Sequence, residues 1–126
     1  MASHEKLAVS GKVTVKLGDH LATVKKVTLK DGIEKSVLEF WGLREVLEKN
    51  EQGTWETKEP QYVRVLLWNA PERCADLVKD GLVLFVRGNL VEEQYFRKDG
   101  TEATSHVLTA WSIGADITQS GLKYEN

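Results

Sequence analysis

The stretch that decides the fold runs through QYVRVLLW (residues 61–68), PERCADLVKDG (71–81), LVLFVRGNL (82–90) and EATSHVLTAW (102–111). The first, third and fourth pieces are rich in β-branched, aliphatic and aromatic residues, which is typical of strands. The second opens with Pro71 and predicts a short helix through Lys79, closed by Asp80 and Gly81. Lys98-Asp99-Gly100 is a hairpin turn signal. This half of the chain therefore predicts strand, helix, strand, turn and strand.

The first 29 residues predict extended chain. KLAVSGKVTVKL (6–17) looks like one long strand, inside which Gly11 predicts a bulge or a sharp bend. Gly18 and Asp19 interrupt or turn this strand, and the extended pattern then continues from residue 20 to 29. A barrel that is small and closed needs such a break in a long first strand.

The middle of the chain is harder to interpret. Lys30-Asp31-Gly32 predicts a turn, followed by a returning strand over residues 33–41 whose register is ambiguous. Residues 42–49 have some helical periodicity, which indicates a single helical turn. Residues 50–60 are polar and acidic and predict a long connection without regular structure. Trp55 lies in it and could pack on the barrel, contact a partner subunit or contact ligand.

Length and composition favour one domain. A chain of 126 residues can bury a core without disulfides or metal, and we expect a domain over 1–117 followed by a short tail over 118–126. The sequence shows no membrane-spanning apolar stretch and no signal-peptide core at its start, so we expect a cytoplasmic protein. Cys74 is the single cysteine and is expected to be a small buried hydrophobe.

The order of elements predicts an all-β fold. One short helix between the third and fourth strands of a five-stranded Greek-key barrel is the layout of the OB-fold, which binds oligonucleotides and oligosaccharides. Aromatic residues at strand ends and near the last hairpin favour single-stranded nucleic acid as the ligand.

Catalysis finds little support in the residues. There is no glycine-rich phosphate loop, and no His or Cys pair has metal-ligand spacing. Glu92 and Glu93 are adjacent, so on a strand they point to opposite faces and make a poor acid–base pair. Ser105 and His106 are also adjacent, so on a strand they too point to opposite faces. We expect no enzyme activity, cofactor, metal or small-molecule substrate.

The charge is small but unevenly distributed. The net charge of −2 argues against nucleic-acid binding, because phosphate neutralisation supplies much of the affinity. Residues 1–38, however, carry seven lysines against four acidic residues, whereas residues 39–63 carry six glutamates against three basic residues. A basic first hairpin and an acidic connection can lie on opposite faces, although charge that is merely solvated is the alternative.

Several segments resemble the bacterial single-stranded-DNA-binding protein family, over roughly residues 6 to 117. KLAVSG (6–11) is similar to the family's Asn-Lys-aliphatic-aliphatic-aliphatic-x-Gly strand, and YVRVLLW (62–68) fits its aromatic-x-Arg-Val-x-aliphatic-aromatic strand. KDGLVLFVRGNL (79–90) repeats Lys-Gly-x-x-Val-x-Val-x-Gly-x-Leu with one inserted residue, and Tyr95 falls at the family's next aromatic position. The resemblance implies sequence-tolerant coating of single-stranded DNA in replication, recombination or repair, by a divergent member of plasmid or phage type.

The resemblance places base stacking on four aromatic residues, which are Trp41, Tyr62, Trp68 and Tyr95. Stacking is worth about 1–3 kcal/mol per base and tolerates any base. At the end of its strand Trp68 could instead belong to the core, and Tyr62 could lie in a subunit contact. The full set of candidate nucleic-acid-binding residues is Trp41, Tyr62, Trp68, Tyr95, Phe96, Lys12, Lys16, Lys25, Lys26, Arg64, Arg87 and Arg97.

The departures from the family pattern keep a second function open. VEEQ (91–94) stands where family members carry basic residues, which predicts weaker and more salt-sensitive DNA binding. The same acidic residues favour the alternative of a barrel used for protein contacts, as in primosome-like accessory proteins. Family members assemble, so we expect a homotetramer, or else a homodimer, that pairs exposed strand edges.

Overall fold

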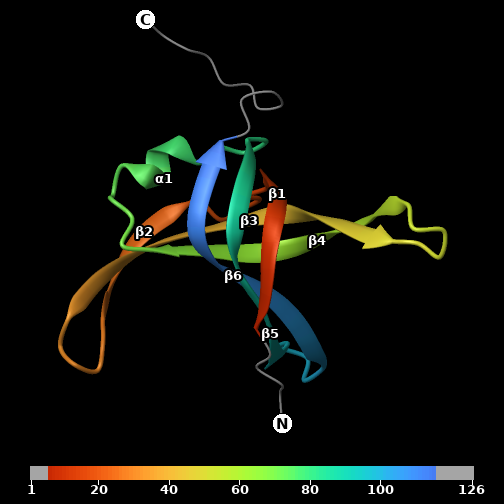
Figure 1. Ribbon diagram of the computed structural model, residues 1–126. Coiled ribbons are helices and arrows are strands. Elements are labelled where there is room, and N and C mark those ends of the chain that lie inside the picture. Colours follow the sequence, from red (N-terminus) through yellow and green to blue (C-terminus); the bar gives the residue numbers. More distant parts are fainter. Residues whose placement is uncertain (1–5, 116–126) are drawn as a thin grey trace, which may run out of the picture.

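The computed structural model describes residues 6–115, and the expected tail over 118–126 lies outside them (Figure 1). The described chain consists of strands and one four-residue helix, so the all-β expectation is confirmed. The elements are β1 (Leu7–Val15), β2 (Thr23–Thr28), β3 (Glu34–Lys49), β4 (Trp55–Trp68), α1 (Cys74–Leu77), β5 (Val83–Phe96) and β6 (Glu102–Ala115).

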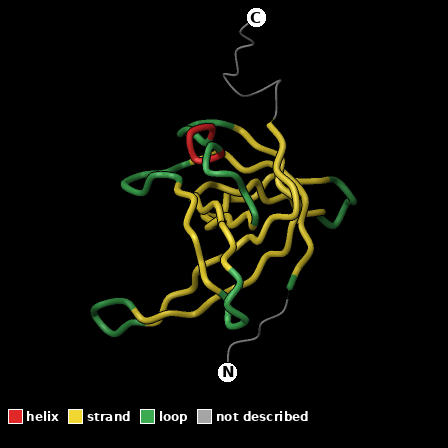
Figure 2. Tube along the Cα trace, turned by 90° about the vertical axis from the view of Figure 1, so that its left-hand side faces the viewer, coloured by secondary structure: helices red, strands yellow, loops and turns green. Residues whose placement is uncertain are grey.

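The strands form one sheet that curls back on itself. Its order is β1-β5-β6-β4-β3-β2, and β1 also pairs with β3, so the pairings run in a ring through β1, β5, β6, β4 and β3. Only β4 and β6, among the described pairs, run parallel; their residues 63–67 and 106–110 are in register. Figure 2 shows the strands wrapped around a centre, with the helix at one end.

The strand count differs from the expected five because the first extended stretch forms two strands. β1 ends at Val15, a turn follows at Gly18 and Asp19, and β2 begins at Thr23. The helix consequently follows the fourth strand of the chain instead of the third. This is the interruption that the Gly18-Asp19 pair predicts. The topology is consistent with an OB-fold.

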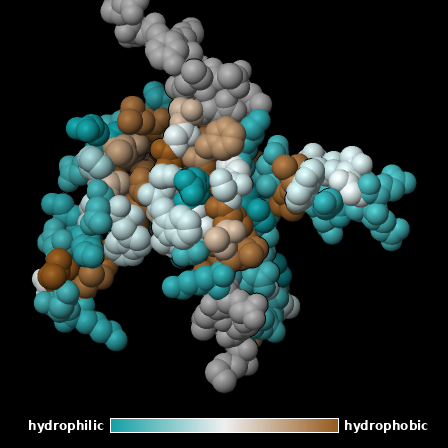
Figure 3. Space-filling model, in the orientation of Figure 1, coloured by the Kyte–Doolittle hydropathy of each residue, from teal (hydrophilic) through white to brown (hydrophobic). Residues whose placement is uncertain are grey.

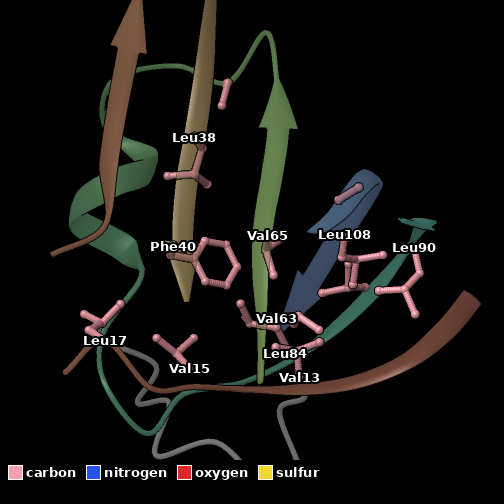
Figure 4. Packing of buried hydrophobic residues seen from close by; sticks show 13 residues of the cluster. Val13, Val15, Leu17, Leu38, Phe40, Val63, Val65, Leu84, Leu90 and Leu108 are labelled. Atoms are coloured by element: carbon pink, nitrogen blue, oxygen red, sulfur yellow. The ribbon is translucent and has the colours of Figure 1, made fainter. Parts of the chain in front are cut away.

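Alternation along the strands builds the core. Val13 and Val15 on β1, Phe40 on β3, Val63 and Val65 on β4, Val86 on β5 and Leu108 on β6 are almost completely buried. Figure 4 shows the labelled side chains of this core converging from the strands on one interior. Because a strand points successive side chains to opposite faces, the neighbours of the core residues face outward. The outer faces of the same strands are therefore free to carry a site.

Two expectations for the middle of the chain are wrong. Residues 42–49 continue β3, because this segment pairs with β4 and, near Gly42, with β1, and pairing overrides weak helical periodicity. Residues 55–60 belong to β4, so the expected long connection is a hairpin turn over 50–54. The Asn50 side chain closes that turn by accepting hydrogen bonds from the backbone N–H groups of Gln52 and Thr54. Residues 51–60 are mostly polar because they lie on a projecting hairpin that is exposed to water.

The two other expected turns are confirmed. Leu29 and Ile33 pair across Asp31-Gly32, and Arg97 and Thr101 pair across Asp99-Gly100, each with a backbone hydrogen bond of 2.8 Å. The glycines have φ values of 82° and 86°, a conformation that side chains rarely adopt. The Asx-type contacts of the two aspartates support these turns.

Of the bulge or sharp bend expected at Gly11, the bulge is not present, and a bulge lies elsewhere. Gly11 pairs with Val86 in an unbroken register between β1 and β5. The register instead shifts between β5 and β6 at Arg87 and Gly88, which leaves Trp111 without an opposite residue. A Cβ on Gly88 would meet the carbonyl oxygen of Thr109 and, at 2.8 Å, the Cα of Ala110. The close backbone approach is the physical reason for glycine at this position.

The helix is shorter than expected and covers an apolar hollow. The helical run that was expected to reach Lys79 ends at Leu77, because the backbone of Val78, with a ψ of 105°, is extended. Between α1 and the end of the sheet lies a cavity of about 300 Å³, lined by apolar side chains that include Phe40, Leu77 and Ile113. Cys74 also lines it and is half-buried. Figure 3 shows apolar side chains gathered over α1.

Candidate nucleic-acid interface

Two aromatic rings lie stacked on the outer face of β3 and β4. Phe40 points into the core, so Trp41 points outward, which resolves the register that the sequence left ambiguous. Trp41 is opposite Arg64 and Leu43 is opposite Tyr62, so the two rings are diagonal neighbours. Their centroids are 4.9 Å apart and their planes differ by 12°. Tyr62 is 44% exposed, so this pair forms a flat surface open to solvent.

A network of four charges crosses the face beside these rings. Arg64 lies 3.8 Å from Glu39 on β3 and 3.9 Å from Glu93 on β5. Glu39 is also 3.4 Å from Lys25 on β2. The network joins four strands and has no net charge, so the guanidinium of Arg64 is already balanced by carboxylates. The sequence predicted that the acidic residues near 92–93 oppose phosphate binding. The structure shows one way in which they can do so, because Glu93 already pairs with Arg64.

Glu92 and Glu93 lie on opposite faces of β5, as strand alternation predicts. Glu93 faces Arg64, whereas Glu92 lies 3.3 Å from the ring of His106, its cross-strand partner on β6. The two glutamates therefore do not form a pair. Within residues 6–115 no group of three or more His, Cys, Asp or Glu side chains could hold a metal ion.

The remaining aromatic candidates lie along the same face or close to it. Trp68 is 37% exposed at the end of β4 and follows Tyr62 and Arg64 at strand spacing, so it lies outside the buried core. Tyr95, 46% exposed, follows Glu93 by two residues on β5 and shares its face. Phe96 is more exposed but points to the other face. The structure therefore groups Tyr95, not Phe96, with the stacked pair.

Apart from Lys25 and Arg64, which belong to the charge network, the basic candidates lie in four places. Lys16 flanks the stacked pair, since its backbone N–H donates to the carbonyl of Trp41 at 3.0 Å. Lys12 lies 5.9 Å from the ring centroid of Phe85 on the β1–β5 surface, where Arg87 is opposite Ser10. Lys26 pairs with Glu34 at 3.8 Å on β2, away from Arg64. Arg97 begins the β5–β6 turn near Tyr95.

The β5–β6 turn is held by a carboxylate. The hydroxyl of Thr101 donates to Asp99 at 2.6 Å, and the backbone N–H of Thr101 donates to the same oxygen at 2.9 Å. These hydrogen bonds lower the pKa of Asp99 below its ordinary value, and the bond from the Thr101 side chain has the larger effect. The turn therefore presents Arg97 and Lys98 on a defined backbone.

A hollow of about 340 Å³ opens beside Trp41. β1 leaves β3 at Gly42 and β2 joins β3 at Glu39, so the segment between the two strands arches away from the sheet. Trp41 and Glu39 line the hollow from β3, and Leu21 and Lys25 line it from the chain opposite. Glu39 and Leu21 were not predicted from the sequence. No local signal marks them, because each acts through strands distant in sequence.

The arrangement of strands is shared with solved structures. A small single-stranded DNA-binding protein from Streptomyces coelicolor superposes with a TM-score of 0.63 at 16% sequence identity, over 92% of this chain and 99% of that one. The chain has the same fold as that protein. No protein-family model and no curated protein matches the sequence.

Two further structures are similar at a lower level. A deletion mutant of the single-stranded DNA binding protein from Thermus aquaticus has a TM-score of 0.40 and 24% identity, over 87% of this chain and 50% of that one. The mitochondrial protein Rim1 from S. cerevisiae has a TM-score of 0.40 and 14% identity, over 90% of this chain and 95% of that one.

The single helix in residues 6–115 is too short to span a membrane.

Proposed function

We propose that this chain binds single-stranded DNA with little dependence on sequence. The observation that carries the proposal is the stacked pair of Trp41 and Tyr62, which lies open on a sheet face next to Arg64. An aromatic ring exposed on a sheet can stack on any base, because every base has a π-face. The fold shared with the Streptomyces coelicolor protein supports this proposal. Trp68 and Tyr95 provide further stacking positions along the strand path.

The backbone of the DNA would contact basic side chains around this face. Lys16 lies beside Trp41, and Arg87 and Arg97 lie on β5 and after it. Arg64 and Lys25 contribute less, because carboxylates already balance their charges. The complete set of proposed contacts is Trp41, Tyr62, Trp68, Tyr95, Phe96, Lys12, Lys16, Lys25, Lys26, Arg64, Arg87 and Arg97. Within this set Phe96, on the other face of β5, and Lys26, which pairs with Glu34, should contribute least. Such binding would serve DNA replication, recombination or repair, where single strands are exposed.

We also propose an architecture and an assembly. β1 and β2 would together stand for the first strand of a five-stranded OB barrel. Leu7, Phe85 and Trp111 are between 46% and 61% exposed on β1, β5 and β6, and apolar side chains on paired strands are suited to contacts between copies. A homotetramer is proposed first and a homodimer second. A light-scattering mass of 14.2 kDa, that of one chain, would contradict both.

Titration with an oligonucleotide tests the proposed function. Adding oligo-dT at low salt should quench tryptophan fluorescence, and added salt should weaken the quenching, because phosphate contacts release counterions. A fluorescence signal that does not change at low salt, together with no shift in gel mobility, would favour a barrel that acts through protein contacts.

A further inference from the structure

The hollow beside Trp41 has the form of a pocket for one base. The stacked pair uses one face of the indole ring, because Tyr62 lies against it at a centroid distance of 4.9 Å. Trp41 also lines the hollow, so another part of the ring surface remains available there. Leu21, which is 79% exposed, lines the same hollow from the arch between β1 and β2. Trp41 and Leu21 supply the large apolar side chains of the lining, and polar side chains supply the rest, which suits a planar ring with a polar edge. The polar lining residues are Asp19, His20, Thr23, Lys25 and Glu39.

The carboxylate of Glu39 lies in the wall of this hollow. Its side chain is 23% exposed, and its contacts with Lys25 and Arg64 are 3.4 Å and 3.8 Å long. Strong charge-assisted hydrogen bonds are shorter, about 2.7–2.9 Å. The two contacts balance the charge of Glu39 at longer range, so the carboxylate keeps lone pairs with which it can accept from a ligand. An ionised carboxylate only accepts hydrogen bonds, so it favours a ligand edge that donates.

The three amino-bearing bases present such an edge and thymine does not. In an unpaired strand the Watson–Crick edges of the bases are free to be read. Cytosine and adenine carry an exocyclic amino group that projects beyond the ring, and guanine has two adjacent N–H donors. The single N–H of thymine is recessed between two carbonyl oxygens, which repel an approaching carboxylate. Glutamate and aspartate accept a hydrogen bond from cytosine N4 in DNA complexes for the same reason.

We propose that this hollow holds one unpaired base and that Glu39 selects a base with an exocyclic amino group over thymine at that position. The proposal rests on the proposed function, since it assigns a base preference to one subsite of the same DNA-binding face. The other stacking positions, on Tyr62, Trp68 and Tyr95, do not line this hollow and stay tolerant. The protein would therefore bind all single strands, with a preference for cytosine-containing over thymine-only strands.

The test compares oligo-dC with oligo-dT of equal length, because both are flexible pyrimidine strands. For the wild-type protein and for Glu39→Gln, the dissociation constants of both strands are measured at one low salt concentration. The amide that this substitution introduces both donates and accepts hydrogen bonds, so it serves either base. The preference for dC over dT, taken as the ratio of the two constants, should fall by about fivefold or more in Glu39→Gln.

Glu93→Gln is the matched control. It removes the same charge and the other carboxylate partner of Arg64, but Glu93 does not line the hollow. It should tighten the binding of both strands equally and leave their ratio unchanged. If Glu39→Gln also shifts both constants by one common factor, the carboxylate acts only on phosphate and the base-selection proposal is overturned. If the wild-type protein binds neither strand, the proposed function itself fails.

Discussion

The indole of Trp41 and the phenol of Tyr62 lie face to face, with centroids 4.9 Å apart and planes 12° from parallel. This separation is that of rings in direct contact, so no base can enter between them unless one of the two rings moves. Each ring instead offers its outer surface. The two side chains act as one platform, and their effects on DNA binding should depend on each other.

A double-mutant cycle measures this dependence. Trp41→Ala and Tyr62→Ala should each weaken the binding of single-stranded DNA by about 1–3 kcal/mol. The double variant should weaken it by clearly less than the sum, because either single change already leaves the other ring unsupported. Fluorescence anisotropy with a labelled oligonucleotide provides the constants. Strictly additive losses would show that the rings contact DNA separately.

Tyr95 and Phe96 are adjacent on β5 but point to opposite faces, so they make a matched pair of variants. Tyr95→Ala should reduce DNA affinity by about 1–3 kcal/mol, because it removes a stacking ring from the face of Arg64. Phe96→Ala, although Phe96 is 76% exposed, should change the affinity little. Circular dichroism should show both variants folded. Equal losses in the two variants would mean that DNA also uses the opposite face of the hairpin.

The salt dependence of binding should distinguish Arg87 from Arg64. Each phosphate that a protein neutralises on a single strand adds about 0.7 to the slope of log K against log salt concentration. Arg87→Gln should lower that slope by about 0.7. Arg64→Gln should lower it less, because Glu39 and Glu93 already balance the charge of Arg64. The reverse order would show that DNA displaces the carboxylates from Arg64.

Gly88→Ala should damage the fold, whereas Gly114→Ala should not. A Cβ at residue 88 would collide with the β6 backbone at Thr109 and Ala110, and backbone cannot rotate away as a side chain can. We expect a loss of about 3 kcal/mol or more in the free energy of unfolding. A Cβ at residue 114 meets nothing within 4 Å, so the change should stay within about 0.5 kcal/mol. Urea denaturation followed by circular dichroism measures both.

The turn at Asp99 should respond to pH in a defined direction. Hydrogen bonds from the side chain and then the backbone of Thr101 lower the pKa of the Asp99 carboxyl in the folded protein. The stability they add is therefore present above the pKa that Asp99 has in the unfolded chain, and it is lost as the pH falls through the lowered value. NMR titration should show this pKa rising toward its ordinary value in Thr101→Val. An unchanged pKa would contradict the role of the hydroxyl.

Sequence reasoning succeeded where local chemistry determines structure. The strand over residues 61–68 and the turns at Asp31-Gly32 and Asp99-Gly100 follow from residue type alone, and the structure has them. The predictions were wrong over residues 42–60. Most of this segment is a hairpin that is exposed on both faces and shows no alternation of apolar and polar residues. The pairing that holds this hairpin as strand involves partners that composition does not reveal.

The residues of the candidate site also divide into those that the sequence could predict and those that only the fold reveals. The aromatic residues could be found from their types and from the family resemblance, and the structure puts Trp41 and Tyr62 in contact. The contact itself depends on a diagonal register between β3 and β4, which the sequence left open. Glu39 could not have been found, and Glu93 could be recognised only as a charge that opposes phosphate. The link of both glutamates through Arg64 requires strands β3, β4, β6 and β5 to lie in that order.

The parallel pairing of β4 with β6 has a consequence for how the protein is made. The partners of residues 63–67 are residues 106–110, and α1 and β5 lie between them in the chain. Contacts between such distant segments are slow to form, since the intervening loop must close first. A nascent chain on the ribosome cannot bring Glu93 across β6 to Arg64 before the last strand has emerged. Fragments that end before β6 should therefore lack an assembled face at the proposed DNA-binding site, even when every aromatic residue of that face is present.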